Sequence, residues 1–129
     1  KIKLREDFRP FAPSILCHCV DEWFEIENQK NYPFMMEVKK IKDVKKKLIP
    51  AVTHIDGTGR LQTVSENENI FFFKLINKFF MKTGVPILLN TSFNENEPIV
   101  LTPQQAISTF LRTKIDGLIL QNTFLLKNS

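Results

Sequence analysis

Three segments of the sequence carry basic or short polar side chains at points where the chain is expected to change direction. Lys3 and Arg9 lie in a basic segment at the start of the sequence, and Arg60 follows a glycine-containing turn. Asn90 and Ser92 follow directly on an apolar run. Ligands of open α/β sheets bind outside the carboxyl ends of the strands. Basic groups that meet Asn and Ser side chains at such an edge would form a phosphate site without a glycine-rich nucleotide loop.

Each of these residues also has a purely structural interpretation. Arg9 stands before Pro10 and Arg60 follows a turn, and both positions are typical of solvated surface arginines. Asn90 and Ser92 could simply terminate a strand, which is the commoner fate of such residues. The usual nucleotide loops, the G-x-S-x-G serine motif and the H-E-x-x-H zinc motif are all absent from the sequence. Taken singly, none of the candidate residues identifies a function.

The elements that must position these residues can be predicted from periodicity and turn signals. DGTG, residues 56–59, has the composition of a tight turn between the arms of a hairpin. Asp21 is expected to cap a short helix at residues 21–28. Strands are predicted at residues 11–19, 33–41, 48–55, 61–65, 85–89, 116–122 and 123–128.

Two longer helices have the clearest signals. Apolar residues at spacings of three and four predict a helix over 69–83 that Gly84 ends, the positions being Ile70, Phe73, Ile76, Phe80 and Phe72, Leu75, Phe79. This spacing favours core packing over an aromatic binding stripe for the FFF segment, residues 71–73. A second helix begins after Thr102, with Pro103 at its first position and Gln105 completing a capping box. Alternating strands and helices predict an α/β or α+β fold with a mixed sheet, in a single domain over residues 1–129.

The composition fits an ordinary globular domain. The 129 residues are 43% apolar and 25% charged, which does not indicate disorder. No apolar stretch reaches the roughly 18 residues that a membrane span needs, and no signal peptide is recognised. Cys17 and Cys19 are expected to be reduced, half-buried thiols of a cytoplasmic protein, because their i, i+2 spacing suits a disulfide poorly.

The net charge is +4, and much of the positive charge lies in KKIKDVKKK, residues 39 to 47. Such a run is most often a solvated face, but it could also bind a phosphate-bearing small molecule or a nucleic acid. No aromatic residues interleave with the lysines, so the run by itself does not separate these possibilities.

Three segments in order closely resemble the C-terminal domain of the carbamoyltransferases that modify nodulation factors and antibiotics. They are K-x-R-E-D-F-R-P-F-A-P-S-I-L, P-A-V-T-H-I-D-G-T-G-R-L-Q-T-V and G-V-P-I-L-L-N-T-S-F-N-E-N-E-P-I-V-x-T-P-x-x-A-I. The likeness runs from Lys3 to about Leu120. It implies a YrdC-like fold, a twisted mixed sheet flanked by helices, similar to threonylcarbamoyl-adenylate synthases.

The resemblance also implies an activity. In this family the domain binds carbamoyl phosphate and ATP, with Mg²⁺, and forms carbamoyl adenylate. A separate N-terminal domain, related to actin and sugar kinases and holding its own metal, then passes the carbamoyl group to a hydroxyl. The chain begins with Lys rather than Met, and we expect it to be a piece of a longer protein that cannot complete this transfer alone.

The resemblance also implies site residues, which are identified by their positions in the matching motifs. Lys3 and Arg9 correspond to the family's phosphate-binding Lys and Arg, and Arg60 to its hairpin arginine. Asn90 and Ser92 correspond to the Asn and Ser after the central strand, and with Arg60 they are the expected catalytic residues. His54 and Asp56 lie near these residues in sequence without an assigned role, and no metal ligands are expected in this chain.

Two other functions remain open. YrdC-like relatives include RNA-binding members, so the chain could be an RNA- or nucleotide-binding module without catalysis, although neither a nucleic acid nor a membrane is the expected partner. It could also be a regulatory domain that kept the fold and lost the activity. The intact set of Lys3, Arg9, Arg60, Asn90 and Ser92 argues against such decay.

Overall fold

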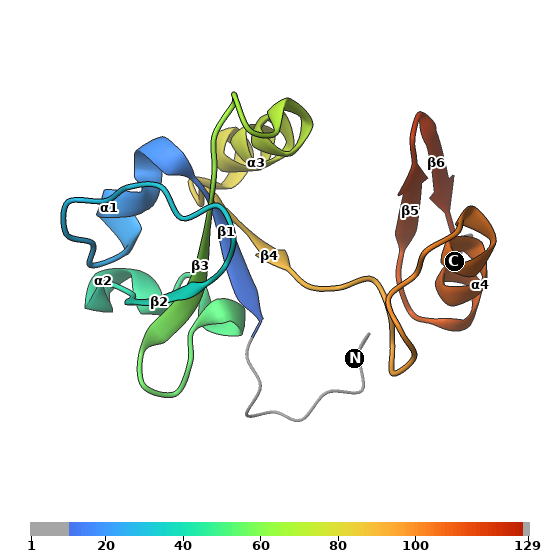
Figure 1. The fold of residues 1–129 in the computed structure, drawn as a ribbon, viewed down its shortest axis with the longest axis horizontal. Helices are drawn as coiled ribbons and strands as arrows, with labels where there is room; N and C mark the ends of the chain where they lie inside the picture. Colours follow the sequence, from blue (N-terminus) through green and yellow to red (C-terminus); the bar gives the residue numbers. More distant parts are fainter. Residues whose placement is uncertain (1–10, 128–129) are drawn as a thin grey trace. The chain divides into compact units, whose positions relative to one another are not determined.

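In a computed structural model of the chain, residues 11–127 are described. Their helices and strands form two compact units, the sheet unit (residues 11–91) and the hairpin unit (residues 92–127), shown in Figure 1. The predicted α/β class is confirmed. The YrdC-like fold and the single domain over residues 1–129 stay predictions.

The sheet unit is built on a mixed sheet of four strands in the order β2-β3-β1-β4. The strands are β1 (Ala12–Leu16), β2 (Glu37–Lys40), β3 (Thr58–Val64) and β4 (Ile87–Asn90). β1 pairs parallel to β3 and antiparallel to β4, while β2 pairs antiparallel to β3. Every residue of β1 is buried, as expected for a strand with a neighbour on each side.

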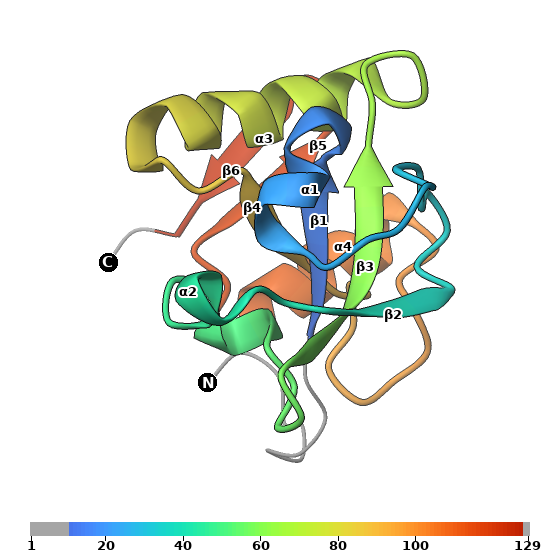
Figure 2. The same cartoon turned by 90° about the vertical axis from the view of Figure 1, so that its left-hand side faces the viewer.

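Helix α3 (Ile70–Thr83) begins and ends as the sequence predicts. The Asn69 side chain accepts a hydrogen bond from the Phe72 amide, and Gly84 ends the helix at a φ of 73°, where a side chain would be strained. The helix contacts β1 and β4. Figure 2 shows it lying at the end of the sheet toward which β1 and β3 run.

The shorter helices of the sheet unit are α1 (Val20–Trp23), α2 (Asp43–Lys46) and two 3-10 turns, η1 (Cys17–Cys19) and η2 (Pro50–Val52). Asp21 does not cap a helix as predicted, because α1 begins earlier, at Val20, and no side chain caps it. The Asp21 carboxylate instead pairs with Lys30 at 2.5 Å.

The core of the sheet unit joins the sheet to the helices. Trp23, Phe24, Leu61 and Ile76 are among its most deeply buried side chains. The predicted core packing is wrong for Phe71, which is 84% exposed, and Ile70, Leu75 and Phe79 are also 41%, 54% and 38% exposed. Phe72, Phe73 and Phe80 are partly buried against the core, as predicted.

The predicted hairpin between residues 48–55 and 61–65 is also wrong. Residues 50–52 form η2, where Pro50 has no amide proton to offer a strand ladder. The turn itself is present, with Gly57 at a φ of 81°. The antiparallel partner of β3 is β2, in a register that places Val38 opposite Arg60.

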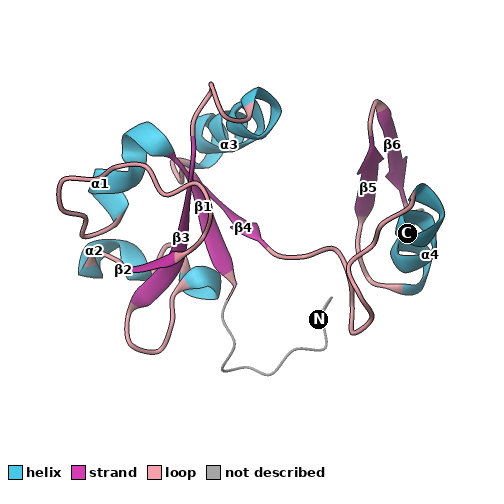
Figure 3. Ribbon diagram, in the orientation of Figure 1, coloured by secondary structure: helices cyan, strands magenta, loops and turns pink. Residues whose placement is uncertain are grey.

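The hairpin unit consists of α4 (Pro103–Arg112) and the antiparallel pair β5 (Gly117–Leu120) and β6 (Thr123–Leu126). Figure 3 shows α4 beside the two strands. The predicted capping box is present, because the Thr102 side chain and the Gln105 side chain each bond the other residue's backbone amide. Ala106, Phe110 and Leu118 form the buried core of this unit.

Candidate functional site

Arg60 lies within β3 with an exposed side chain. Among residues 11–127, its guanidinium group has no ion pair. A guanidinium group that is exposed and has no carboxylate partner keeps its N–H donors available for an anion. Its planar geometry allows it to donate two hydrogen bonds to two oxygens of a phosphate.

A network of side-chain amides lies on the face of the sheet that carries Arg60. Gln62 is two residues further along β3 and therefore points to the same face as Arg60. Its Oε1 accepts hydrogen bonds from Ser14 Oγ at 2.5 Å and from Asn90 Nδ2 at 2.9 Å. Its Nε2 donates to the Pro33 carbonyl oxygen at 3.2 Å.

The register of the strands explains why these residues meet. Ser14 on β1 lies beside Gln62 on β3, and Ala12 on β1 lies opposite Asn90 on β4. Ala12 and Ser14 share a face because they are two residues apart, so Asn90 and Arg60 also project from this face. One strand separates them, a span of about 10 Å between backbones. A small anion between the two side chains could contact both.

Sequence reasoning missed Ser14 and Gln62, although each stands in one of the motifs that identified the family resemblance. Ser14 is the only polar residue of β1, and Gln62 lies between the buried residues Leu61 and Thr63 of β3. Ser14 is fully buried and Gln62 is half-buried, so their polar atoms must find partners within the protein. A polar residue at such a position is the signal that could have identified them.

Of the other predicted site residues, only Ser92 lies within residues 11–127. Ser92 belongs to the hairpin unit, where its hydroxyl donates to Asn94 Oδ1 at 2.6 Å. Lys3 and Arg9 lie outside the described residues. The grouping of these three residues with Arg60 and Asn90 stays a prediction.

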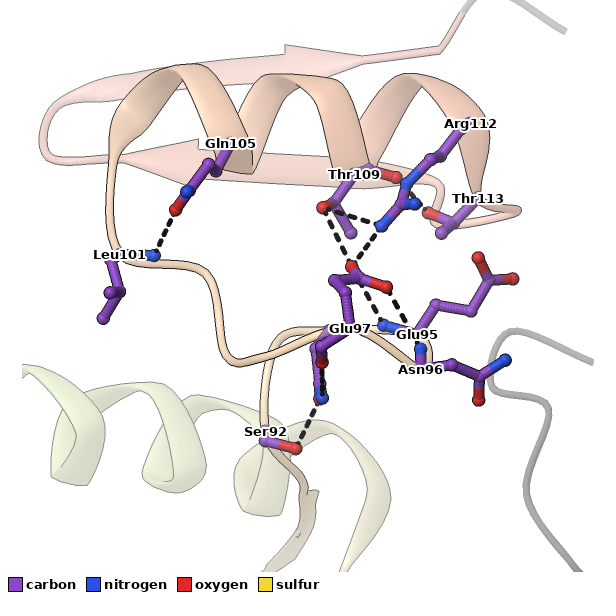
Figure 4. Close-up of polar contacts among 10 residues, drawn as sticks. Ser92, Glu95, Asn96, Glu97, Leu101, Gln105, Thr109, Arg112 and Thr113 are labelled. Atoms are coloured by element: carbon purple, nitrogen blue, oxygen red, sulfur yellow. Dashed lines mark hydrogen bonds and ion pairs between the residues drawn. The ribbon is translucent and has the colours of Figure 1, made fainter.

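Glu97 organises the loop that precedes α4 (Figure 4). Its carboxylate accepts hydrogen bonds from the backbone amides of Glu95 and Asn96, at 3.3 and 3.1 Å, and forms an ion pair with Arg112. Thr109 Oγ1 also donates to it, at 3.4 Å. Hydrogen bonds from backbone amides, first its own and then those of Glu95 and Asn96, outweigh partial desolvation and lower the pKa of Glu97.

An open pocket of about 300 Å³ lies between this loop and α4. The residues that line it are Glu97, Pro98, Ile99, Val100, Leu101, Gln105, Ser108, Thr109 and Arg112. Its two charged groups, Glu97 and Arg112, neutralise each other. This pocket therefore offers less to an anion than Arg60, which has no ion pair within the described part of the chain.

His54 and Asp56 maintain the turn before β3. Thr58 donates both its hydroxyl, at 2.7 Å, and its amide, at 3.0 Å, to Asp56 Oδ1. These bonds, the hydroxyl first, lower the pKa of Asp56. The His54 amide donates to the Thr58 carbonyl oxygen at 2.8 Å. Both residues thus have a structural role in holding the turn that leads to Arg60.

The CHC segment folds as the 3-10 turn η1 rather than as a strand. Both thiols are free, as expected, with Cys17 half-buried and Cys19 buried. Burial is the main cause that raises the pKa of each thiol. Within residues 11–127, no cluster of three or more His, Cys, Asp or Glu side chains could hold a metal ion.

Most lysines of the basic run are engaged within the protein. Lys39, Lys40 and Lys46 form ion pairs with Glu37, Glu25 and Asp43. Lys42 donates to the Asp21 carbonyl oxygen at 2.5 Å, and Lys45 lies 4.5 Å from the centre of the Trp23 ring. These contacts favour the interpretation of the run as a structured protein surface over that of a nucleic-acid site.

None of the helices formed by residues 11–127 combines the length and the apolar character that crossing a membrane requires.

Comparisons with a family model and with individual proteins identify the same family. The family model described as carbamoyltransferase C-terminus matches residues 1–127. The nodulation protein NolNO of Sinorhizobium fredii is 50% identical over 128 residues, which cover 98% of this chain and 19% of that protein. The nodulation protein NolO of Bradyrhizobium diazoefficiens is 48% identical over 120 residues, which cover 92% of this chain and 22% of that protein.

A protein named as a carbamoyltransferase is also similar. The 3'-hydroxymethylcephem-O-carbamoyltransferase of Amycolatopsis lactamdurans is 35% identical over 96 residues, which cover 74% of this chain and 18% of the enzyme. The chain thus spans about a fifth of the length of these relatives. With the family model matched over nearly its whole length, the chain belongs to the carbamoyltransferase C-terminus family.

Proposed function

We propose that this chain is the carbamoyl-activating part of an ATP-dependent O-carbamoyltransferase. It would bind carbamoyl phosphate and ATP. Water would cleave carbamoyl phosphate to carbamate and phosphate, and a carbamate oxygen would then attack the α-phosphorus of ATP, which forms carbamoyl adenylate and releases pyrophosphate. Membership of the carbamoyltransferase C-terminus family supports the transferase class. The observation that carries the finer proposal is the exposed Arg60, without an ion pair among residues 11–127, on the same face as Asn90.

The chemistry of the two residues suits this reaction. In phosphoryl and nucleotidyl transfer, most of the catalysis comes from positioning the phosphates and stabilising charge on their oxygens. Arg60 would bind a phosphate through its guanidinium fork, and Lys3 and Arg9 would add further positive charge. The Asn90 amide offers a donor and an acceptor that match the planar carbamoyl group, while Ser92 would donate to this group or to a phosphate.

Magnesium would enter as the counterion of ATP. Mg²⁺ usually keeps several water ligands and is held through substrate phosphates and one or two carboxylates. Residues 11–127 contain no cluster of carboxylates that would form a dedicated cage, which fits an ion carried by the nucleotide. When bound, it would neutralise charge on the phosphates.

Completion of the transfer would depend on the rest of the protein. The relatives are about five times longer than this chain, and we propose that an N-terminal domain of the parent protein, with its own metal, delivers the carbamoyl group to the acceptor hydroxyl. We also propose a cytoplasmic location, where Cys17 and Cys19 would stay reduced.

Calorimetry tests this proposal against the two alternatives. The chain would be titrated separately with carbamoyl phosphate, with ATP and Mg²⁺, and with single-stranded RNA at physiological ionic strength. We expect saturable binding of carbamoyl phosphate and ATP. Binding of RNA alone would favour a nucleic-acid module, and binding of none of the three would favour a domain that has lost its ligands.

A further inference from the structure

The Pro33 carbonyl oxygen determines which way the Gln62 side-chain amide points. A carbonyl oxygen can only accept, so the atom that faces it at 3.2 Å must be the donor Nε2. The Gln62 acceptor Oε1 must then face the opposite direction, toward Ser14 and Asn90. The Ser14 hydroxyl can donate or accept, so it is compatible with either orientation of the Gln62 amide. The Pro33 carbonyl oxygen therefore determines this orientation.

This orientation in turn fixes the Asn90 amide. Only the Nδ2 group of Asn90 can donate to Gln62 Oε1, at 2.9 Å. The Asn90 acceptor Oδ1 is therefore turned away from Gln62, at the end of β4. A backbone carbonyl on the loop before β2 thus determines, through one glutamine, that an acceptor is presented at the candidate site.

Gln62 itself has no spare acceptor for a ligand. Its Oε1 has two lone pairs, and the hydrogen bonds from Ser14 and Asn90 use both. Ser14 is fully buried, so its bond to Gln62 is shielded from competing water. The residue therefore acts on a ligand through Asn90, as a positioning residue.

We infer that Gln62 makes the site selective for the carbamoyl amino group by holding Asn90 Oδ1 toward it. The inference rests on the function proposed above. Carbamoyl phosphate and acetyl phosphate are similar in shape, but the first carries an NH₂ donor where the second carries a methyl group. A site that presents a fixed acceptor there rejects the methyl analogue, because the acceptor would be left without its hydrogen bond.

The test compares the affinity for carbamoyl phosphate with that for acetyl phosphate, measured on the same protein by calorimetry. The unsubstituted chain should prefer carbamoyl phosphate by about tenfold, the value of one well-placed hydrogen bond. Gln62→Glu keeps an acceptor toward Asn90 and should retain this preference. Gln62→Lys replaces the acceptor by a donor, so the Asn90 amide should turn its Oδ1 toward the lysine. This variant should therefore lose the preference for carbamoyl phosphate.

Two features of this experiment separate the effect of Gln62 on the orientation of Asn90 from its effect on charge. The added charge in either variant changes the affinity for both phosphates alike, so the ratio of the two dissociation constants reports orientation alone. Gln104, exposed on α4 in the hairpin unit, provides the matched control, and Gln104→Lys should keep the wild-type ratio. Gln62→Met, which is neutral and of similar length, should lower the ratio as Gln62→Lys does.

The outcomes separate this inference from the proposed function. If the unsubstituted chain binds no carbamoyl phosphate, both are overturned. If it binds carbamoyl phosphate but does not prefer it to acetyl phosphate, or if Gln62→Lys or Gln62→Met keeps the preference, only the role of Gln62 is overturned. Failure of both the Lys and the Met variant to fold would also overturn that role, because Gln62 would then be required for the fold.

Discussion

Asn90 Nδ2 donates a hydrogen bond to Gln62 Oε1 at 2.9 Å, although β1 lies between their two strands. This bond crosses the face of the sheet from which Arg60 also projects. The candidate site therefore rests on three hydrogen-bonded strands and not on a loop. Side chains on such a scaffold are held more firmly than side chains on connecting segments, which is what substrate positioning requires.

Replacing Arg60 by alanine should weaken the binding of carbamoyl phosphate or ATP by about 2 kcal/mol or more, which is about thirtyfold in affinity. The loss reflects the removal of a charge-assisted contact to phosphate. Arg60→Lys should recover part of the affinity, because the charge remains while the guanidinium fork is lost. Calorimetry measures both effects.

The matched control for Arg60 is Lys78→Ala, which removes an exposed positive charge from α3. It should leave the affinity almost unchanged. Equal losses in the two variants would mean that Arg60 contributes only to the general positive charge of the chain, and wild-type affinity in a folded Arg60→Ala protein would remove it from the site.

Neighbouring residues of α3 should differ sharply in their contribution to stability. Ile76 is fully buried, and Ile76→Ala should lower the free energy of unfolding by about 2–5 kcal/mol. Leu75 is 54% exposed, and Leu75→Ala should cost about 1 kcal/mol or less. Chemical denaturation of the two variants gives the comparison. Similar costs would contradict the orientation of the helix described above.

The hairpin unit should lose stability in acid through Glu97. Its pKa is lowered from 4.5 in the folded protein, so the charged form is favoured by folding. The stabilising contribution is therefore present above pH 4.5 and is lost as the pH falls through the lower folded pKa. An NMR titration of the Glu97 carboxyl group should give a pKa below 4.5. Glu97→Gln should remove this part of the acid sensitivity, and a pKa above 4.5 would contradict the assignment.

Local signals in the sequence were sufficient for the two longer helices. Asn69 and Gly84 bound α3 as predicted, and the Thr102–Gln105 capping box starts α4. These signals are local because caps satisfy backbone groups within one turn of the helix. The pattern of apolar residues also identified the class of fold, since strands and helices differ in period.

Pairing between distant strands could not be predicted in the same way. Residues 48–55 were assigned to a hairpin because they stand next to the DGTG turn, whereas β3 pairs with β2 and, in parallel, with β1. The partner of a parallel strand is set by tertiary packing and not by adjacent sequence. For the same reason the sequence identified Arg60 and Asn90 as candidates but not Gln62, the residue that links Asn90 to β3.

The 129 residues alone should not carbamoylate an acceptor. Carbamoyl adenylate is a labile mixed anhydride, and the proposed acceptor site belongs to another domain. Incubation with ATP, Mg²⁺, carbamoyl phosphate and hydroxyl-bearing acceptors, followed by mass spectrometry, should reveal no carbamoylated product. Release of pyrophosphate that depends on carbamoyl phosphate would be compatible with this result. A carbamoylated acceptor would refute the proposed division of labour.

The central claim is that carbamoyl phosphate binds on the sheet face between Arg60 and Asn90. The most direct measurement is a titration of the ¹⁵N-labelled chain with carbamoyl phosphate, observed by NMR. The account predicts saturable shifts of the Arg60 Nε–H and the Asn90 side-chain NH₂ signals, with the same dissociation constant for both. Shifts confined to the lysine run at residues 39–47, or no shifts at saturating ligand, would contradict it.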